Sequence, residues 1–175
     1  MRPGNTRDHQ GSDPVVGLRK VTADDAPLLY RWANDPQTRR NSLSSDPIEF
    51  DDHLEWLHSM MEDPLTPSFI AHTQWDDLGT VALDLRPSVQ DDSHSPNRHL
   101  LRHGRVSITV APIHRGCGYA TPMLRAVCRK AKDLGVPTLE AVVKRHNEPS
   151  LCAFRSCGFW VSRQRGDIWT LDYRL

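Results

Sequence analysis

Residues 110–122 of the chain read Val-Ala-Pro-Ile-His-Arg-Gly-Cys-Gly-Tyr-Ala-Thr-Pro. The segment joins the end of a strand rich in β-branched residues to the start of a long helix. The first N–H groups of a helix lack intrahelical partners and lie at the positive end of its dipole. Gly116 and Gly118 let this backbone approach a ligand without an intervening Cβ. The stretch therefore predicts an anion site that suits a diphosphate.

Two other phosphate-binding motifs do not fit this turn. It lacks the three spaced glycines of the dinucleotide-binding fingerprint, and no Gly-Lys-Ser or Gly-Lys-Thr follows as in a P-loop. Pro122 falls in the first helical turn, where a missing N–H costs little. A tight turn that binds nothing stays an alternative at this point.

Hydrophobic periodicity on both sides of the turn predicts an α+β chain built around one mixed sheet. Strands are expected at 17–21, 67–73, 79–85, 105–111, 138–144, 159–163 and 167–173. Helices are expected at 22–35, 47–62, 118–134 and 148–156. On the second of these helices, the apolar residues expected to share one face are Phe50, Leu54, Leu57 and Met61.

Length and composition limit the class of protein. A chain of 175 residues fits one domain with a continuous core. Lys plus Arg and Asp plus Glu number 22 each, so the formal net charge is zero and a nucleic-acid partner is not expected. No apolar run approaches the roughly 20 residues that span a bilayer, so no membrane partner is expected. We expect a disordered leader at 1–16 and a single domain at 17–175.

The cysteines and histidines predict no metal site. The cysteines lack zinc-type spacing, and without a secretion signal they are expected to be reduced thiols in a cytoplasmic protein. These are Cys117, Cys128, Cys152 and Cys157. His94, His99 and His103 fall in the polar stretch 87–104, where a solvated loop is expected.

Two motifs resemble those of the GNAT superfamily of N-acetyltransferases. Arg115-Gly-Cys-Gly-Tyr-Ala120 is similar to the R/Q-x-x-G-x-G/A signature of that superfamily. The segment Asn147-Glu-Pro-Ser150, followed by Phe154 and Gly158-Phe159, is similar to its N-x-x-S…G-F element. The resemblance covers roughly residues 17–175. It implies the GNAT-type acyl-CoA N-acyltransferase fold, a mixed, mostly antiparallel sheet of six or seven strands flanked by about four helices.

The resemblance implies acetyl-CoA, or another short acyl-CoA, as co-substrate. The backbone of Val110 and Pro112 would run beside the pantetheine arm. The residues implied for the diphosphate are Arg115, Gly116, Cys117, Gly118, Tyr119 and Ala120. Those implied for the pantetheine side and the adjoining helix are Asn147, Ser150 and Phe154. As an alternative, Asn147 caps the helix that begins at Glu148, and Gly158 ends it.

The usual catalytic acid and base of the superfamily are missing. The positions of its Glu and Tyr correspond to Arg105 and Phe154, and neither side chain can exchange a proton in that role. Substitutes for the base are His53, whose ordinary pKa suits the task, and Glu140 on the strand after the long helix. Cys152 could protonate the thiolate, although an inert thiol is the simpler interpretation. Orientation alone, with the proton leaving through water, is the remaining alternative.

The first half of the chain carries the information on the amine. Its pattern resembles the N-terminal region of nucleotide-sugar amine N-acetyltransferases of the pseudaminic-acid type. Arginines would meet phosphates, tryptophans would stack on a base or sugar, and the remaining side chains would bond hydroxyls. The residues concerned are Trp32, Asn34, Arg39, Arg40, His53 and Trp56. Alternatively, Trp32 and Trp56 belong to the core and the two arginines lie on the surface without a role in binding.

Two other functions stay open. GNAT enzymes that acetylate ribosomal proteins or peptides share similar segments, which makes a peptide amine the second substrate class. A GNAT-fold module that senses acyl-CoA without catalysis is the third, because the usual acid and base are absent. A homodimer is compatible with any of these.

Overall fold

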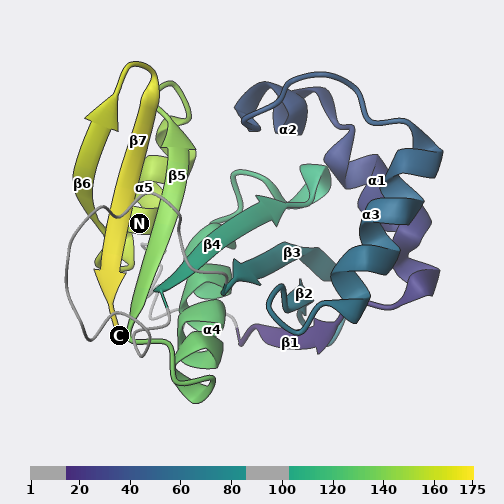
Figure 1. The fold of residues 1–175 in the computed structure, drawn as a ribbon, viewed down its shortest axis with the longest axis horizontal. Helices are drawn as coiled ribbons and strands as arrows, with labels where there is room; N and C mark the ends of the chain where they lie inside the picture. The colour runs from purple at the N-terminus through teal and green to yellow at the C-terminus, as the bar shows by residue number, and fades with distance from the viewer. Residues whose placement is uncertain (1–14, 86–102) are drawn as a thin grey trace, which may run out of the picture.

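The computed structural model describes residues 15–85 and 103–175 and shows one seven-stranded sheet flanked by helices (Figure 1). The strand order is β1-β2-β3-β4-β5-β7-β6. The strands are β1 (Gly17–Lys20), β2 (Ser68–His72), β3 (Asp77–Asp84), β4 (His103–Val110), β5 (Thr138–Lys144), β6 (Trp160–Arg165) and β7 (Ile168–Arg174). The helices are α1 (Ala26–Ala33), α2 (Pro36–Asn41), α3 (Phe50–Glu62), α4 (Ala120–Asp133) and α5 (Glu148–Ser156), with 3₁₀ turns η1 (Ala23–Asp25) and η2 (Pro112–His114).

The α+β class, the seven strands and the two C-terminal helices follow the sequence prediction closely. Most of the expected leader and most of the stretch 87–104 lie outside the described residues. Val16 is buried in the main core, so the folded part begins before residue 17. His103 and Gly104 already belong to β4 and not to a loop.

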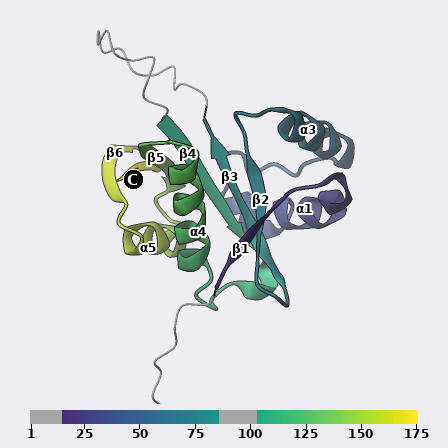
Figure 2. The same ribbon diagram turned by 90° about the horizontal axis from the view of Figure 1, so that it is seen from below.

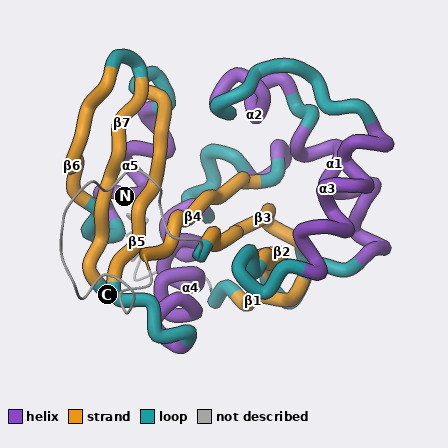
Figure 3. The backbone as a smooth tube through the Cα atoms, viewed as in Figure 1, coloured by secondary structure: helices purple, strands orange, loops and turns teal. Residues whose placement is uncertain are grey.

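All neighbouring strands run antiparallel except β4 and β5. This parallel pair is short and joins only three residues of each strand. The pairs are His103↔Thr138, Gly104↔Leu139 and Arg105↔Glu140. Beyond them β4 pairs only with β3, and β5 pairs only with β7. As a consequence, β5, β7 and β6 form one half of the sheet and diverge from β4 and its neighbours (Figures 1 and 3).

Helices cover both faces of the sheet (Figure 2). The amphipathic α4 buries Met123, Leu124, Val127 and Ala131 in the main core, as its periodicity predicts. Helices α1 and α3 form a second, smaller core on the other face of the sheet. At roughly 25 cal/mol per Å² of apolar surface, such burial is the main favourable contribution to folding.

The helix α2 was not predicted. The pair Asp35-Pro36 indicated only the end of a helix, yet it also begins a new one. The Asp35 carboxylate accepts hydrogen bonds from the N–H groups of Gln37 (3.1 Å) and Thr38 (3.0 Å), and Pro36 has the φ that a first helical residue needs. Residues 15–85 and 103–175 therefore contain five α-helices, where about four were expected.

The buried face of α3 also differs from the expected one. Leu57 and His53 are buried, whereas Phe50 and Met61 are exposed. Leu54 lies between these extremes. The expected apolar face is thus rotated, and a histidine takes part in the packing.

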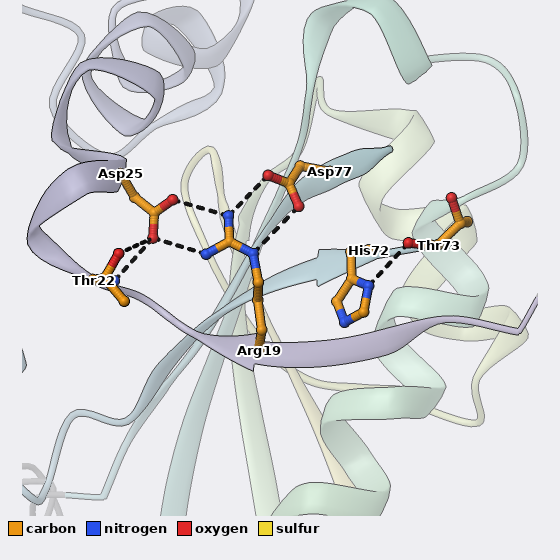
Figure 4. A network of polar contacts seen from close by, with 6 residues as sticks. All are labelled: Arg19, Thr22, Asp25, His72, Thr73 and Asp77. Carbon is orange, nitrogen blue, oxygen red and sulfur yellow. Dashed lines mark hydrogen bonds and ion pairs between the residues drawn. The ribbon is translucent and has the colours of Figure 1, made fainter. Parts of the chain in front are cut away.

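A network around Arg19 ties β1 to η1 and β3 (Figure 4). The guanidinium donates to both carboxylate oxygens of Asp25 at 2.9 Å and to Asp77 at 2.8 Å. Asp25 is 8% exposed and also accepts from the N–H and hydroxyl of Thr22. The hydrogen bonds from Arg19 lower the pKa of Asp25, outweighing the opposite effect of burial. The two carboxylates raise the pKa of Arg19 in return.

No helix in residues 15–85 or 103–175 is both long and apolar enough to cross a membrane. Over the same ranges, no three side chains of the His, Cys, Asp or Glu type gather closely enough to hold a metal ion. All four cysteines lie within the described part of the chain and are free thiols.

Candidate active site

The divergence of β4 from β5 creates the first half of the site. Segments 106–110 of β4 and 141–144 of β5 do not pair with each other, and we call them together the strand fork. Along β4, every second residue turns its N–H and C=O away from β3 and toward the fork. An extended ligand that contains amides can pair with this edge as an added strand would. The pantetheine arm of coenzyme A has that form.

The second half is the turn between β4 and α4. Gly116 and Gly118 have φ values of 74° and 82°, which favour glycine, and a Cβ added at either would meet no atom within 4 Å. Within the described structure, the N–H groups of Gly116, Gly118 and Tyr119 donate no backbone hydrogen bond. They precede the first residue of a 14-residue helix, at the positive end of its dipole. This arrangement, here called the cradle (residues 115–120), fits a diphosphate.

The position of the cradle is fixed from β3. The N–H of Ala111 donates to the carbonyl of Leu78 at 2.8 Å, immediately after the last residue of β4. Gly79 has a φ of 147°, and a Cβ there would overlap the carbonyl oxygen of Thr109. Only glycine lets β3 approach the end of β4 this closely.

His114 is a residue that sequence reasoning missed. Its Nε2 is buried and, within the described part of the chain, has no hydrogen-bond partner. Its ring lies edge-on to Tyr119, with centroids 5.6 Å apart. A buried polar atom without a partner is costly, so its position beside the cradle is consistent with a site that binds a polar group. The sequence signal was its place directly before Arg115.

The side chain of Arg115 points to α2. Its guanidinium lies 2.6 Å from Asp35, donates to the Thr38 hydroxyl at 2.8 Å and donates to Gln37 at 3.2 Å. Partial burial would raise the pKa of Asp35, but the hydrogen bonds from Arg115 and from α2 N–H groups outweigh it, so the pKa is lowered. The diphosphate role expected for Arg115 therefore rests on its backbone in this structure.

The start of α5 lies next to the end of β5. The side-chain oxygen Oδ1 of Asn147 accepts from the N–H of Ser150 at 3.4 Å, which is the capping role considered as an alternative. Phe154 is 2% exposed and packs edge-on against Phe159 in the core. Cofactor contacts for Asn147, Ser150 and Phe154 stay predictions.

The two candidate bases lie in different places. Glu140 is the last β5 residue paired with β4, at the vertex of the fork, and Arg105 donates to its carboxylate at 3.0 Å. His53 is 1% exposed, and its Nε2 donates to the carbonyl of Ala26 at 3.2 Å. Burial lowers the pKa of His53, and the carbonyl only partly opposes this. The structure thus places Glu140 at the fork and His53 in the packing of α1 against α3.

Besides His53, three more of the six residues expected for the acceptor have structural contacts. Trp32 is 8% exposed, in the second core. Asn34 bonds both backbone groups of Ile48, at 2.9 and 2.8 Å. Arg39 donates to two backbone carbonyls and to the Ser42 hydroxyl.

The remaining expected residues are more accessible, with the exception of His53 described above. Arg40 is exposed, and its carbonyl accepts a 3.0 Å hydrogen bond from Lys144 of β5. Trp56 is 55% exposed, with its ring 5.6 Å from that of His53. Acceptor roles for all six residues stay predictions.

The fork and the cradle together define the class of the protein as an acyltransferase that uses an acyl-CoA donor. Residues 16–160 match the profile of the Acetyltransferase (GNAT) domain, and the chain belongs to this family. It is an N-acetyltransferase with acetyl-CoA as co-substrate and an amine as acceptor.

Several named acetyltransferases are similar to this chain in sequence or in fold. Bacillus subtilis YwnH, named as a candidate phosphinothricin acetyltransferase, is 28% identical over 122 residues, which is 70% of this chain and 69% of YwnH. A spermidine N-acetyltransferase of Vibrio cholerae, solved with CoA and spermine, has a TM-score of 0.76 at 19% identity, covering 91% of this chain and 95% of that one. Campylobacter jejuni PseH, solved with acetyl coenzyme A, has a TM-score of 0.65 at 15% identity, with 91% and 98% covered. At these identities the two structures show the shared fold only.

Proposed function

We propose that the acceptor is a primary amine on a small molecule that also carries an anionic group, with a nucleotide-linked amino sugar as the first candidate. The observation that carries this proposal is the cationic surface where α2 meets the end of β5. Arg40 and Arg145 are exposed there, and the half-buried Lys144 donates to the carbonyl of Arg40. Such charges favour an anionic partner and disfavour a polycation.

The carboxylates near this surface are fewer than its cations. Asp35 is already paired with Arg115, at 2.6 Å. Asp167, in the turn between β6 and β7, lies 3.4 Å from His146, which offsets its charge only when protonated, and Glu148 at the start of α5 is exposed. A polyamine or an aminoglycoside would bind better where carboxylates outnumber cations. The charge pattern therefore supports an anionic acceptor over a polycationic one.

The protein residues would divide the work of acetyl transfer. Acetyl-CoA supplies the thioester that donates the acetyl group. Backbone N–H groups of the cradle would hold the diphosphate, and those on the fork edge of β4 could donate to the developing oxyanion. The Glu140 carboxylate, held by Arg105, would take the amine proton directly or through a water.

A panel of amines tests the proposal through thiol release from acetyl-CoA. The panel contains a UDP-linked amino sugar, phosphinothricin, spermidine, kanamycin and a peptide with a free N-terminus. We expect turnover with the first or second amine and none with the polycations. Turnover restricted to spermidine or kanamycin would overturn the proposal, and turnover restricted to the peptide would favour the second substrate class. Calorimetric binding of acetyl-CoA without turnover of any amine would favour the sensor.

A further inference from the structure

The helix α2 is attached to both sides of the strand fork. On the β4 side, the cradle residue Arg115 binds Asp35, Gln37 and Thr38. On the β5 side, the Nζ of Lys144 donates to the carbonyl of Arg40 at 3.0 Å. Figure 1 shows α2 above the diverging ends of β4 and β5. One short helix thus bridges the two strands that the fork separates.

These attachments decide where α2 lies. A helix of six residues is not stable alone, because nucleation is costly and few hydrogen bonds repay it. No residue of α2 is buried, so apolar packing contributes little to its position. What remains is the cap and the side-chain bonds. Arg39 holds α2 locally through the carbonyls of Ala33 and Asp46, and the Asp35 carboxylate provides both the cap and a bond to the cradle. It accepts from two N–H groups of α2 and pairs with the guanidinium of Arg115.

The same geometry argues against a primary contact between the Arg115 guanidinium and the diphosphate. The side chain is 23% exposed, and three of its five N–H donors are directed at Asp35, Thr38 and Gln37. Moving it to the diphosphate would leave the partly buried Asp35 carboxylate without its cation, which is unfavourable. The glycine backbone of the cradle can bind the diphosphate without this side chain.

We propose that Arg115 is a positioning residue that couples the cofactor cradle to α2, the helix beside the acceptor entrance. Its backbone belongs to the cradle, while its guanidinium holds Asp35 at the start of α2. Ordering of the cradle by coenzyme A therefore restrains α2, and the restraint prepares the entrance for the amine. The position of the acceptor beside α2 rests on the proposed function, whereas the coupling itself does not.

Hydrogen–deuterium exchange with coenzyme A as the only ligand tests the coupling. In the wild type, saturating coenzyme A should slow exchange both in the cradle, at 117–120, and at two amides of the other element, Arg39 in α2 and its C-cap Ser42. We expect the slowing in α2 to be about fivefold or more, the lower end of typical coupling between sites. In Arg115→Gln and Asp35→Asn, protection of the cradle should persist while protection of α2 is lost.

The two substitutions are chosen to leave the local folds intact. Glutamine is an alternative at the Arg115 position in the family signature, and asparagine is as good a helix cap as aspartate. Asp46→Asn is the matched control. Asp46 is an exposed residue after α2, and Arg39 bonds its backbone carbonyl, which the substitution leaves in place. This control should keep both protections.

Steady-state kinetics give an independent readout once the panel identifies an amine. Arg115→Gln and Asp35→Asn should each raise KM for the amine, by about tenfold, and leave KM for acetyl-CoA within about twofold. The double variant should be no worse than Arg115→Gln alone, because the Arg115–Asp35 pair is already lost in that single variant. Arg115→Lys should recover part of the loss.

Two results would overturn the coupling. In the first, Arg115→Gln loses protection of the cradle, which would assign the side chain to the cofactor. In the second, protection of α2 is unchanged in both variants. Absence of any protection of the cradle in the wild type would instead contradict the cofactor site, so the two failures are distinguishable.

Discussion

Arg105 and Glu140 form the last residue pair that joins β4 to β5, and their side chains meet at 3.0 Å on the same face of the sheet. Beyond this pair the strands separate. By family resemblance, position 105 would carry the glutamate that acts as general base, but this chain has an arginine there. The carboxylate of Glu140 lies instead on the neighbouring strand, β5. The ion pair with Arg105 therefore holds the Glu140 carboxylate at the vertex of the fork, although this carboxylate is on β5 and not at the family position on β4.

Glu140→Gln should lower kcat for the amine identified by the panel about 100-fold, the lower range for loss of a general base. The amide cannot accept a proton, but it can still bond Arg105, so the fork should persist. Thiol release measures kcat, and calorimetry should show an affinity for acetyl-CoA within about twofold of the wild type. Glu62→Gln, at the exposed end of α3, is the control. An unchanged kcat in Glu140→Gln would leave orientation and water as the mechanism.

Two glycines should respond differently to replacement by alanine. At Gly118 the added Cβ meets no protein atom, so the cost is mainly the strain of φ 82°, about 1 kcal/mol. The methyl group should nevertheless weaken acetyl-CoA binding about tenfold, because it occupies the space where a diphosphate would approach. At Gly79 the Cβ overlaps the Thr109 carbonyl, so Gly79→Ala should destabilise the fold by about 3 kcal/mol or more. Calorimetry and urea unfolding measure the two effects, and equal stability losses would contradict this assignment.

The sequence predicted the fold well where a local pattern determines it. The bounds of β5 and α5 agree with the expectation residue for residue, and α4 differs by two residues at its start and one at its end. The glycine-rich turn between β4 and α4 also lies where it was expected, because strand periodicity, glycine and helix periodicity follow one another directly. These features need only neighbouring residues to form.

The acceptor side could not be predicted in the same way. The role of Arg39 as a phosphate ligand stays a prediction, and the sequence did not show that its donors bond the carbonyls of Ala33 and Asp46 and the Ser42 hydroxyl. Arg115 was expected at the diphosphate site, and that role stays a prediction; what the sequence did not show is the pairing of its side chain with Asp35, 80 residues earlier. A single sequence does not show such long-range pairing of side chains. The same limit explains why α2 was missed.

Asp25→Asn should lower the free energy of unfolding by about 2 kcal/mol, because a buried carboxylate with charge-assisted bonds to Arg19 and Thr22 is lost. Asp77→Asn should cost less than about 1 kcal/mol, since the Asp77 carboxylate is one-third exposed and water screens its ion pair with Arg19. Urea unfolding at pH 7 measures both. Equal losses in the two variants would show that burial of Asp25 does not set the strength of the network.

His53 should make the protein less stable as the pH falls below about 6.5, its ordinary pKa. Burial lowers the pKa of His53 in the folded chain, so between the two pKa values the unfolded chain binds a proton that the folded chain does not. Folding stability then falls with decreasing pH, by up to ~1.4 kcal/mol per pH unit for one proton, until the folded pKa is reached. At pH 7.5 and above both states are neutral and no loss is expected. His53→Gln keeps a donor for the Ala26 carbonyl but does not titrate, so urea unfolding at pH 7.5 and 5.5 should show a smaller difference for this variant than for the wild type. If both proteins lose the same stability over that interval, His53 is protonated in the folded chain, and its place in the packing of α1 against α3 does not exclude the charge.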